Sequence, residues 1–230
     1  MLIKTLKHIT YLIFPRVCLA CYQMDVEEER LFCSDCLYHL PFTNDFDGHG
    51  VNKVIQSFYG KIPVKEGAAL LHFDKAGIVQ QMMHQYKYNR KVEIGQKLGK
   101  IAAQKAIIGE KFKNIDAVTA VPLHPIKQAK RGYNQSEVFA KAFAFEFGKP
   151  FVKCLKKTIN TESQTRKTRI ERLKNVEGSV EVSNPHFVKN KSVLLVDDVL
   201  TTGATLEVSA KALLQAGANF VSVLVLASAR

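Results

Sequence analysis

The segment VLLVDDVLTTGAT, from Val193 to Thr205, joins four aliphatic residues to two adjacent carboxylates and then to threonines around a glycine. The aliphatic run predicts a buried strand over residues 192–198, and the small polar residues after it predict a loop. Two charges at that junction are costly to bury, because a buried charge loses its hydration. Since ligands of open α/β sheets bind beyond the carboxyl ends of strands, Asp197 and Asp198 indicate a binding site.

Strand and helix patterns alternate on both sides of this segment. The alternation predicts a parallel α/β sheet flanked by helices. The charged stretch 156–191 has weak periodicity and is expected to be a long excursion. The expected strands are GAALLHF (67–73), IDAVTAVP (115–122), FVKCL (151–155) and FVSVLVLA (220–227), and the expected helices are 78–88, 92–108, a helix capped by Asn134 and Glu137 that ends at Phe147, and 205–216.

The loop after the acidic pair has the composition of an anion site. Its small residues let backbone N–H groups close around an anion, and the following helix adds its positive N-terminal dipole. The two carboxylates can bind sugar hydroxyls, a divalent cation, or both. A phosphorylated sugar satisfies both halves of the site. Two alternatives are weaker: a phospho-acceptor receiver domain needs far more chain after its acidic pair, and a turn capped by one Asp explains only one carboxylate.

Four of the five cysteines form two closely spaced pairs. The pairs are Cys18 with Cys21, and Cys33 with Cys36. This spacing brings four thiolates to one point, which predicts a closed, structural zinc site. A disulfide reading conflicts with a reducing compartment, and an iron–sulfur cluster has compatible ligands but no other support. His39 is expected at the surface, and Cys154 is expected to be a small core residue.

Composition and charge limit the classes of protein to which this chain can belong. The chain has 230 residues, 47% hydrophobic and 23% charged, which is ordinary for a soluble globular protein. Its net charge of +12 favours polyanionic partners, although a generic basic surface explains it equally well. No apolar run approaches the roughly 20 residues that cross a bilayer, so no membrane insertion is expected. The first apolar patch is too short for a secretory signal and predicts an amphipathic helix, so we expect a cytoplasmic protein. The residues at helical spacing are Leu2, Leu6, Ile9 and Ile13.

The segment Val193–Thr205 resembles the PRPP-binding motif of type I phosphoribosyltransferases, where PRPP is 5-phosphoribosyl-1-pyrophosphate. More narrowly, the chain resembles the ComF/GntX family over nearly its full length. The matching features are the four-cysteine module, VPLHP at 121–125, RGYNQSEVFA at 131–140 and the PRPP loop. The resemblance implies a zinc module over residues 1–47 and a phosphoribosyltransferase-like domain over residues 48–230.

The resemblance also implies roles for particular residues. Asp197 and Asp198 would hold the ribose 2′- and 3′-hydroxyls as the catalytic acidic pair, and Leu123 and His124 would belong to the pyrophosphate loop. Mg²⁺ would enter with PRPP. The residues that would bind the rest of PRPP, the 5′-phosphate above all, are Val199, Thr201, Thr202, Gly203, Ala204 and Thr205. The residues that would anchor a flexible hood are Gln164, Arg169, Arg172 and Asn175.

Basic residues leave the function open between two classes. Lys and Arg outnumber Glu between Lys153 and Lys174 and can clamp pyrophosphate, lie on DNA, or form a solvated loop. The stretch HQYKYNRK (84–91) can stack bases, although packing of Tyr86 or Tyr88 into the core is the simpler interpretation. The first hypothesis is a phosphoribosyltransferase with an unknown acceptor that acts in DNA uptake or DNA utilisation. The second is a non-catalytic PRPP sensor that binds single-stranded DNA or a helicase-like ATPase. A plain zinc-ribbon protein leaves the PRPP loop unexplained.

Overall fold

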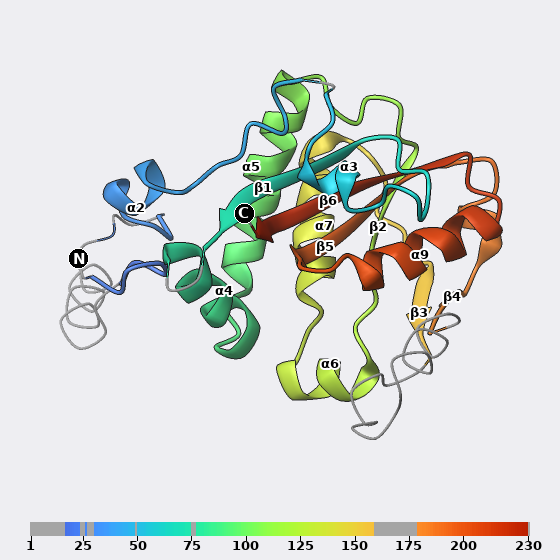
Figure 1. Ribbon diagram of the computed structural model, residues 1–230. Coiled ribbons are helices and arrows are strands. Elements are labelled where there is room, and N and C mark those ends of the chain that lie inside the picture. Colours follow the sequence, from blue (N-terminus) through green and yellow to red (C-terminus); the bar gives the residue numbers. More distant parts are fainter. Residues whose placement is uncertain are drawn as a thin grey trace, which may run out of the picture.

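The computed structural model describes residues 17–23, 26, 30–48, 50–74, 77–158 and 179–229 (Figure 1). The predicted N-terminal helix and the hood residues lie outside these ranges. The predicted parallel sheet is confirmed, with four strands in the order β1-β6-β5-β2. Its strands are β1 (Gly67–Phe73), β2 (Ala117–Ala120), β5 (Ser192–Leu200) and β6 (Phe220–Ala229).

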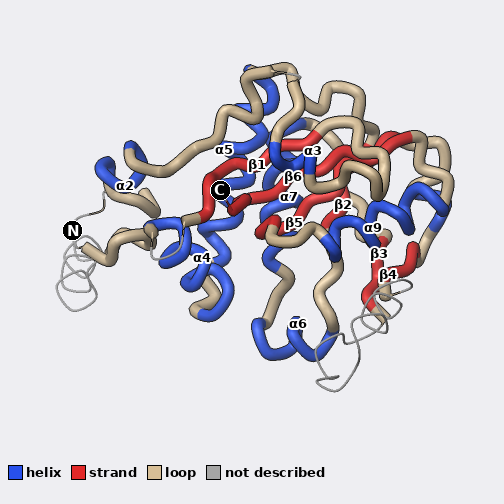
Figure 2. The backbone as a smooth tube through the Cα atoms, in the orientation of Figure 1, coloured by secondary structure: helices blue, strands red, loops and turns tan. Residues whose placement is uncertain are grey.

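Helices cover both faces of this sheet, which explains why β5 begins as a continuous apolar run rather than an alternating one. Val193 and Leu195 pack into the core beside α9 (Ala204–Gln215). Leu194 and Val196 point the other way. They share a buried cluster with apolar residues of the longer helices, which are α5 (Val92–Ile108) and α7 (Gln135–Phe147). Figures 1 and 2 show how these two helices lie relative to the sheet.

Several local predictions need correction. The expected strand FVKCL is wrong for most of its length, because Phe151 makes only an isolated bridge to Val118 and regular pairing begins at Leu155. Cys154 is nevertheless buried, as expected.

The structure also contains elements that the sequence does not predict. A short helix follows Pro122, and part of the stretch 156–191 forms regular structure. The remaining elements are α2 (Ser34–Tyr38), α3 (Lys53–Gln56), α4 (Ile78–Tyr88), α6 (Pro125–Arg131), the antiparallel pair β3 (Leu155–Lys157) and β4 (Val180–Val182), and the 3-10 helix η1 (Pro185–Phe187).

The cysteine segment is joined to the main sheet through the chain that follows it. The His72 amide donates to the Pro41 carbonyl at 2.8 Å, and the Thr43 amide donates to the Leu70 carbonyl at 3.1 Å. Apolar side chains of the segment lie in the same buried cluster as those of β1, α5 and α7. The proposed boundary between residues 47 and 48 therefore separates two segments that share one core. Among the described helices, none combines the length and the apolar character needed to cross a bilayer.

Candidate functional site

A cleft of about 510 Å³ opens at the carboxyl ends of β2 and β5, beside α4 and α6. This volume is within the usual range of small-molecule sites. β5 continues to Leu200, two residues beyond the predicted end of the strand, so the acidic pair lies within the strand rather than at its last two positions. Six of the predicted site residues line the cleft, which brings the acidic pair and the two predicted loops together. They are Leu123, Asp197, Asp198, Val199, Thr201 and Thr205.

Asp197 is held by two donors. The Ser136 hydroxyl donates to its Oδ1 at 2.7 Å, and the Asp198 amide donates to the same atom at 2.8 Å. Burial, and then the neighbouring charge of Asp198, raise the pKa of the Asp197 carboxyl to about 7. The carboxyl is therefore partly protonated at neutral pH, and a ligand that donates hydroxyl hydrogens favours its charged form.

Asp198 is paired with a lysine from α4. Lys87 Nζ lies 2.9 Å from Asp198 Oδ2, and the two side chains are 23% and 17% exposed. A pair this sheltered from water is stronger than a surface ion pair. A ligand hydroxyl that binds Asp198 must therefore share the carboxylate with Lys87 or displace it.

The threonine loop encloses a second, smaller hollow of about 40 Å³, lined by Asp197, Val199 and residues 201–206. The N-cap of α9 is Gly203, in a left-handed conformation with φ of 77° and with no side-chain cap. The alternative in which an Asp caps this helix is therefore wrong. Because Gly203 has no side chain, an anion in the hollow can accept hydrogen bonds from the first-turn amides.

The two residues assigned to the pyrophosphate loop have different environments. Leu123 lines the cleft, as expected. His124 is the N-cap of α6, and its Nδ1 accepts a hydrogen bond from the Ile126 amide at 3.3 Å. It is absent from the described lining of the cleft, so its observed role is to begin α6. The predicted hood residues Gln164, Arg169 and Arg172 lie outside the described residues.

Sequence reasoning missed the partners of the acidic pair. Lys87 belongs to HQYKYNRK, a segment whose composition also suits base stacking, and Ser136 belongs to RGYNQSEVFA, a segment that carries the family resemblance. The second motif is anchored to the site because Asn134 caps α7 and its Nδ2 donates to the Val121 carbonyl at 3.0 Å. Tyr86 is fully buried, as expected for one of the two tyrosines, whereas Tyr88 is 58% exposed and lines the cleft.

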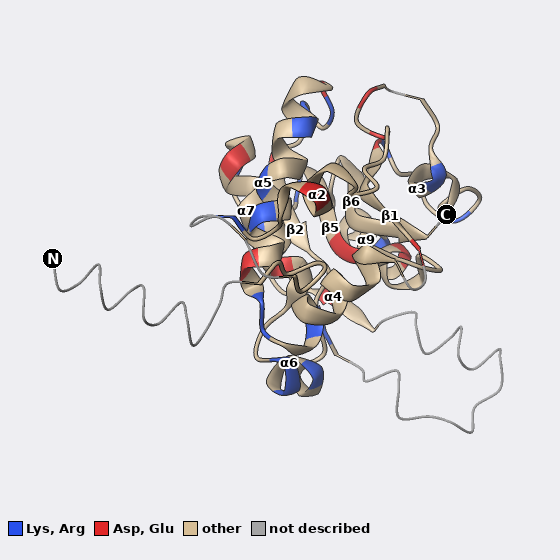
Figure 3. Ribbon diagram, turned by 90° about the vertical axis from the view of Figure 1, so that its left-hand side faces the viewer, with Lys and Arg blue, Asp and Glu red and all other residues tan. Residues whose placement is uncertain are grey.

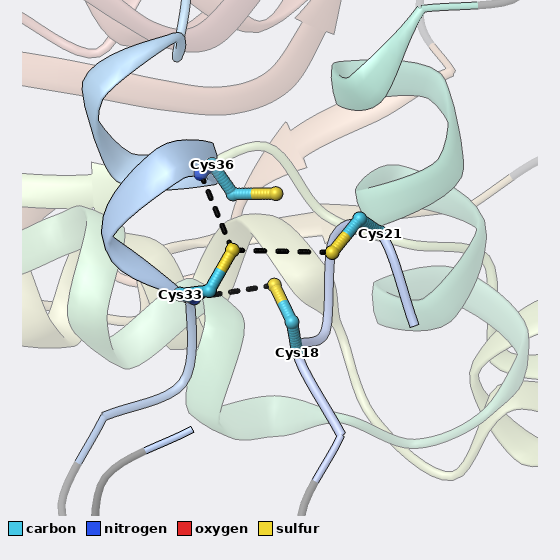
Figure 4. Close-up of side chains that lie close together, drawn as sticks. All are labelled: Cys18, Cys21, Cys33 and Cys36. Atoms are coloured by element: carbon cyan, nitrogen blue, oxygen red, sulfur yellow. Dashed lines mark hydrogen bonds between the residues drawn. The ribbon is translucent and has the colours of Figure 1, made fainter. Parts of the chain in front are cut away.

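The four predicted cysteines converge in the structure (Figure 4). Their sulfur atoms all lie within 4.8 Å of one another, and Cys21 Sγ is 3.9 Å from Cys33 Sγ. Backbone amides donate to the sulfurs: the Cys33 amide lies 3.3 Å from Cys18 Sγ, and the Cys36 amide lies 3.3 Å from Cys33 Sγ.

This donor set fits a tetrahedral metal. Metal–sulfur bonds of about 2.3 Å place tetrahedral sulfurs about 3.8 Å apart, which agrees with the 3.9 Å between Cys21 Sγ and Cys33 Sγ. Burial raises the pKa of the Cys18 thiol, but amides of Cys21, Cys33 and Ala20 favour the thiolate and bring the pKa down to about 7. His39 is at the surface, as predicted, since its side chain is 62% exposed. Its Nδ1 lies 3.1 Å from Asp35 Oδ1. The cluster can hold a metal ion.

Comparison with known proteins places the chain among phosphoribosyltransferase-like proteins. Residues 134–230 match the phosphoribosyl transferase domain family. The DNA utilization protein YhgH of Salmonella typhi is 28% identical over 146 residues, which are 62% of this chain and 63% of that protein. Competence protein F of Haemophilus influenzae is 31% identical over 155 residues, which are 64% of this chain and 67% of that protein. The match thus spans less than two thirds of the Salmonella protein.

A likeness also exists to a solved structure. It is the glutamine phosphoribosylpyrophosphate amidotransferase from B. subtilis. The alignment covers 62% of this chain and 30% of the amidotransferase chain, at 23% sequence identity and a TM-score of 0.44.

Proposed function

Because the chain belongs to the ComF family of phosphoribosyltransferase-like proteins, we propose that it binds PRPP together with Mg²⁺. The observation that carries the proposal is the meeting of an acidic pair and an uncapped helix N-terminus in one cleft. The acidic pair suits the vicinal hydroxyls of a ribose, and the helix N-terminus suits a phosphate. A ribose with a 5′-phosphate requires both.

Each part of the cleft has a defined task in this proposal. Asp197 and Asp198 accept hydrogen bonds from the ribose hydroxyls, with Ser136 and Lys87 fixing their positions. The loop 201–205 surrounds the 5′-phosphate. Lys127 and Arg131 line the cleft together with Leu123, and their positive charges would balance the pyrophosphate. Mg²⁺ bound to the substrate would neutralise it further. In phosphoribosyl transfer the bond from C1 to the pyrophosphate oxygen breaks, pyrophosphate leaves with the electron pair, and an acceptor forms the new bond to C1.

The cysteine cluster holds zinc in this proposal, with a structural role. Four thiolates leave no open position for a substrate, so zinc stabilises the fold rather than reacting. All five cysteines are free in the structure, which suits a reducing compartment such as the cytoplasm. Since named relatives are a competence protein and a DNA utilization protein, we place this chain in DNA uptake or DNA utilisation.

A second candidate function is a PRPP-responsive adaptor without turnover. The observation that favours it is the net charge of +12, together with Lys and Arg gathered on α6 at one end of the molecule (Figure 3). This surface suits single-stranded DNA or an acidic face of a helicase-like partner. DNA binding that weakens steeply with salt, without release of pyrophosphate from PRPP, would favour the adaptor. Release of pyrophosphate in the presence of an acceptor would favour the transferase.

Thermal protection tests the proposed ligand. At roughly 100 times its dissociation constant, PRPP with Mg²⁺ should stabilise the fold by about 2.7 kcal/mol, which raises Tm by several degrees. Ribose 5-phosphate fills only part of the site and should protect less at the same concentration. Equal protection by PRPP and by inorganic phosphate would mean that the loop binds anions without recognising the sugar.

A further inference from the structure

The segment that joins the cysteine cluster to β1 also contacts the threonine loop. We propose that Phe58 is a positioning residue, whose ring fixes Gly203 and thereby orients the amides at the start of α9 toward the small hollow. The inference rests on the proposed function in one respect, namely that this hollow receives the 5′-phosphate. Phe58 itself lies outside the described lining of both the cleft and the small hollow.

The loop 201–205 is weakly held by its own residues. Thr201 and Thr202 are exposed. The hydrogen bond from the Ala204 amide to Thr202 Oγ1 is long, at 3.5 Å. Gly203 has a φ of 77°, and a glycine loses more conformational freedom on folding than any other residue. Packing from outside the loop is therefore needed to keep Gly203 in this conformation.

Two apolar side chains flank Gly203, which is buried although Thr202 and Ala204 on either side of it are exposed. A Cβ atom at Gly203 would lie 3.5 Å from Leu200 Cδ1 and 3.6 Å from Phe58 Cε1, which are ordinary van der Waals distances. Phe58 is 1% exposed and belongs to the same buried cluster as Leu200. Leu200 directly precedes the loop, whereas Phe58 packs Gly203 against a segment far away in the sequence.

Phe58 is fixed relative to the sheet through α3. Asn52 caps α3 by accepting from the Ile55 amide at 3.1 Å, and its Nδ2 donates to the Gly67 carbonyl of β1 at 2.6 Å. The Phe58 amide donates to the Ile55 carbonyl at 3.0 Å, and the Phe58 carbonyl accepts from the Lys61 amide at 3.0 Å. The position of the ring is therefore set by β1, which does not depend on a ligand in the cleft.

A second contact between the same two segments is weaker. Lys61 Nζ lies 3.9 Å from Glu207 Oε2, and the two side chains are 42% and 34% exposed. An ion pair this exposed contributes little, so the Phe58 ring provides most of the support. The Glu207 amide is more informative than its carboxylate, because it donates to the Gly203 carbonyl at 2.8 Å. Hydrogen exchange at this amide reports whether Gly203 stays in place.

The first turn of α9 explains why a fixed Gly203 matters for binding. The first amides of a helix have no partner within the helix, so they are free to bind an anion. Their directions depend on the residue that precedes the helix, which here is Gly203. A misplacement of about 1 Å by a distant mutation can cost roughly 100-fold in rate. Loss of the Phe58 ring should therefore weaken every ligand that places a phosphate in the small hollow.

The test compares variants of the full chain at a temperature where all of them are folded. Phe58→Leu removes the ring, and Phe58→Met replaces it with a flexible side chain that fills more of the space. Tyr59→Leu is the control within the same segment, since Tyr59 is 57% exposed. Phe143→Leu is the matched buried control, since Phe143 is 0% exposed and lies in the other core cluster. The measurements are hydrogen exchange at the Glu207 amide without ligand, and calorimetric titration with PRPP and Mg²⁺ and with ribose 5-phosphate.

We expect the Glu207 amide of Phe58→Leu to exchange roughly tenfold faster, and PRPP and ribose 5-phosphate to bind this variant roughly tenfold more weakly. Phe58→Met should recover part of the lost affinity, and the two controls should match the wild type. An unchanged exchange rate or an unchanged PRPP affinity in Phe58→Leu, or equal effects in Phe143→Leu, overturns the inference. Faster exchange in Phe58→Leu, in a protein whose wild type does not bind PRPP, supports the role of Phe58 and refutes the proposed ligand.

Discussion

We expect the Cys36→Ser variant to lose its metal and to unfold about 10 °C or more below the wild type. Structural zinc in zinc-finger peptides contributes an apparent free energy of about 10–16 kcal/mol, and the loss of one of four thiolates should remove much of a contribution of this kind. The effect should reach the main domain because Cys36, Phe32 and Leu40 lie in the same buried cluster as Leu70 and Leu98. Metal content and a thermal unfolding curve followed by circular dichroism measure both consequences.

The fifth cysteine is a matched control for this experiment. Cys154 is also buried, but it packs in the other core cluster and its sulfur lies 3.4 Å from the Thr119 hydroxyl. Cys154→Ala should keep the full metal content and lose only the small stability expected of a modest core truncation. If the Cys36→Ser variant kept its metal and unfolded at the same temperature as the Cys154→Ala variant, the cluster would not be the site that stabilises this fold.

The Asp197→Asn variant should lose PRPP affinity by roughly 100-fold, since hydrogen bonds to charged groups contribute about 1.5–3 kcal/mol.

The same variant should be as stable as the wild type at acid pH and more stable at neutral pH. Asp197 has a folded pKa of about 7 against an ordinary value of 3.8, so the native state binds more protons than the unfolded state between these values. Its contribution to stability is therefore present at low pH and is lost as pH rises to about 7.

Unfolding curves at several pH values between 4 and 8 check the sign of this effect. The difference in Tm between Asp197→Asn and the wild type should grow with pH and become constant above about 7. Glu207→Gln, in α9 and outside the described lining of the cleft, is the control for a lost carboxylate, because the Glu207 carboxylate lies 3.9 Å from Lys61 Nζ in a loose ion pair. A variant that bound PRPP normally would remove Asp197 from the ligand site.

The parts of the site that the sequence predicted are local in the chain. The acidic pair, the threonine loop and the start of α9 follow one another between Val193 and Thr205, so their chemistry is visible in one short segment. The two cysteine pairs are likewise recognisable from spacing alone. Each of these predictions depends only on neighbouring residues and on the period of strands and helices.

The parts that the sequence did not predict depend on packing between distant segments. Ser136 reaches Asp197 because α7 packs against β5, and Lys87 reaches Asp198 because α4 lies beside the cleft. No spacing in the chain encodes either contact. The FVKCL prediction failed for a related reason, since strand propensity there finds a pairing partner in β4 only from Leu155 onward.

The most direct test of the central claim is a calorimetric titration of PRPP with Mg²⁺ into the metal-loaded wild type, beside the Asp197→Asn/Asp198→Asn double variant. We predict saturable binding of one PRPP per chain in the wild type and no measurable binding in the variant. The absence of binding in a folded, metal-loaded wild type would contradict the account and would leave the acidic pair and its loop without the ligand proposed for them.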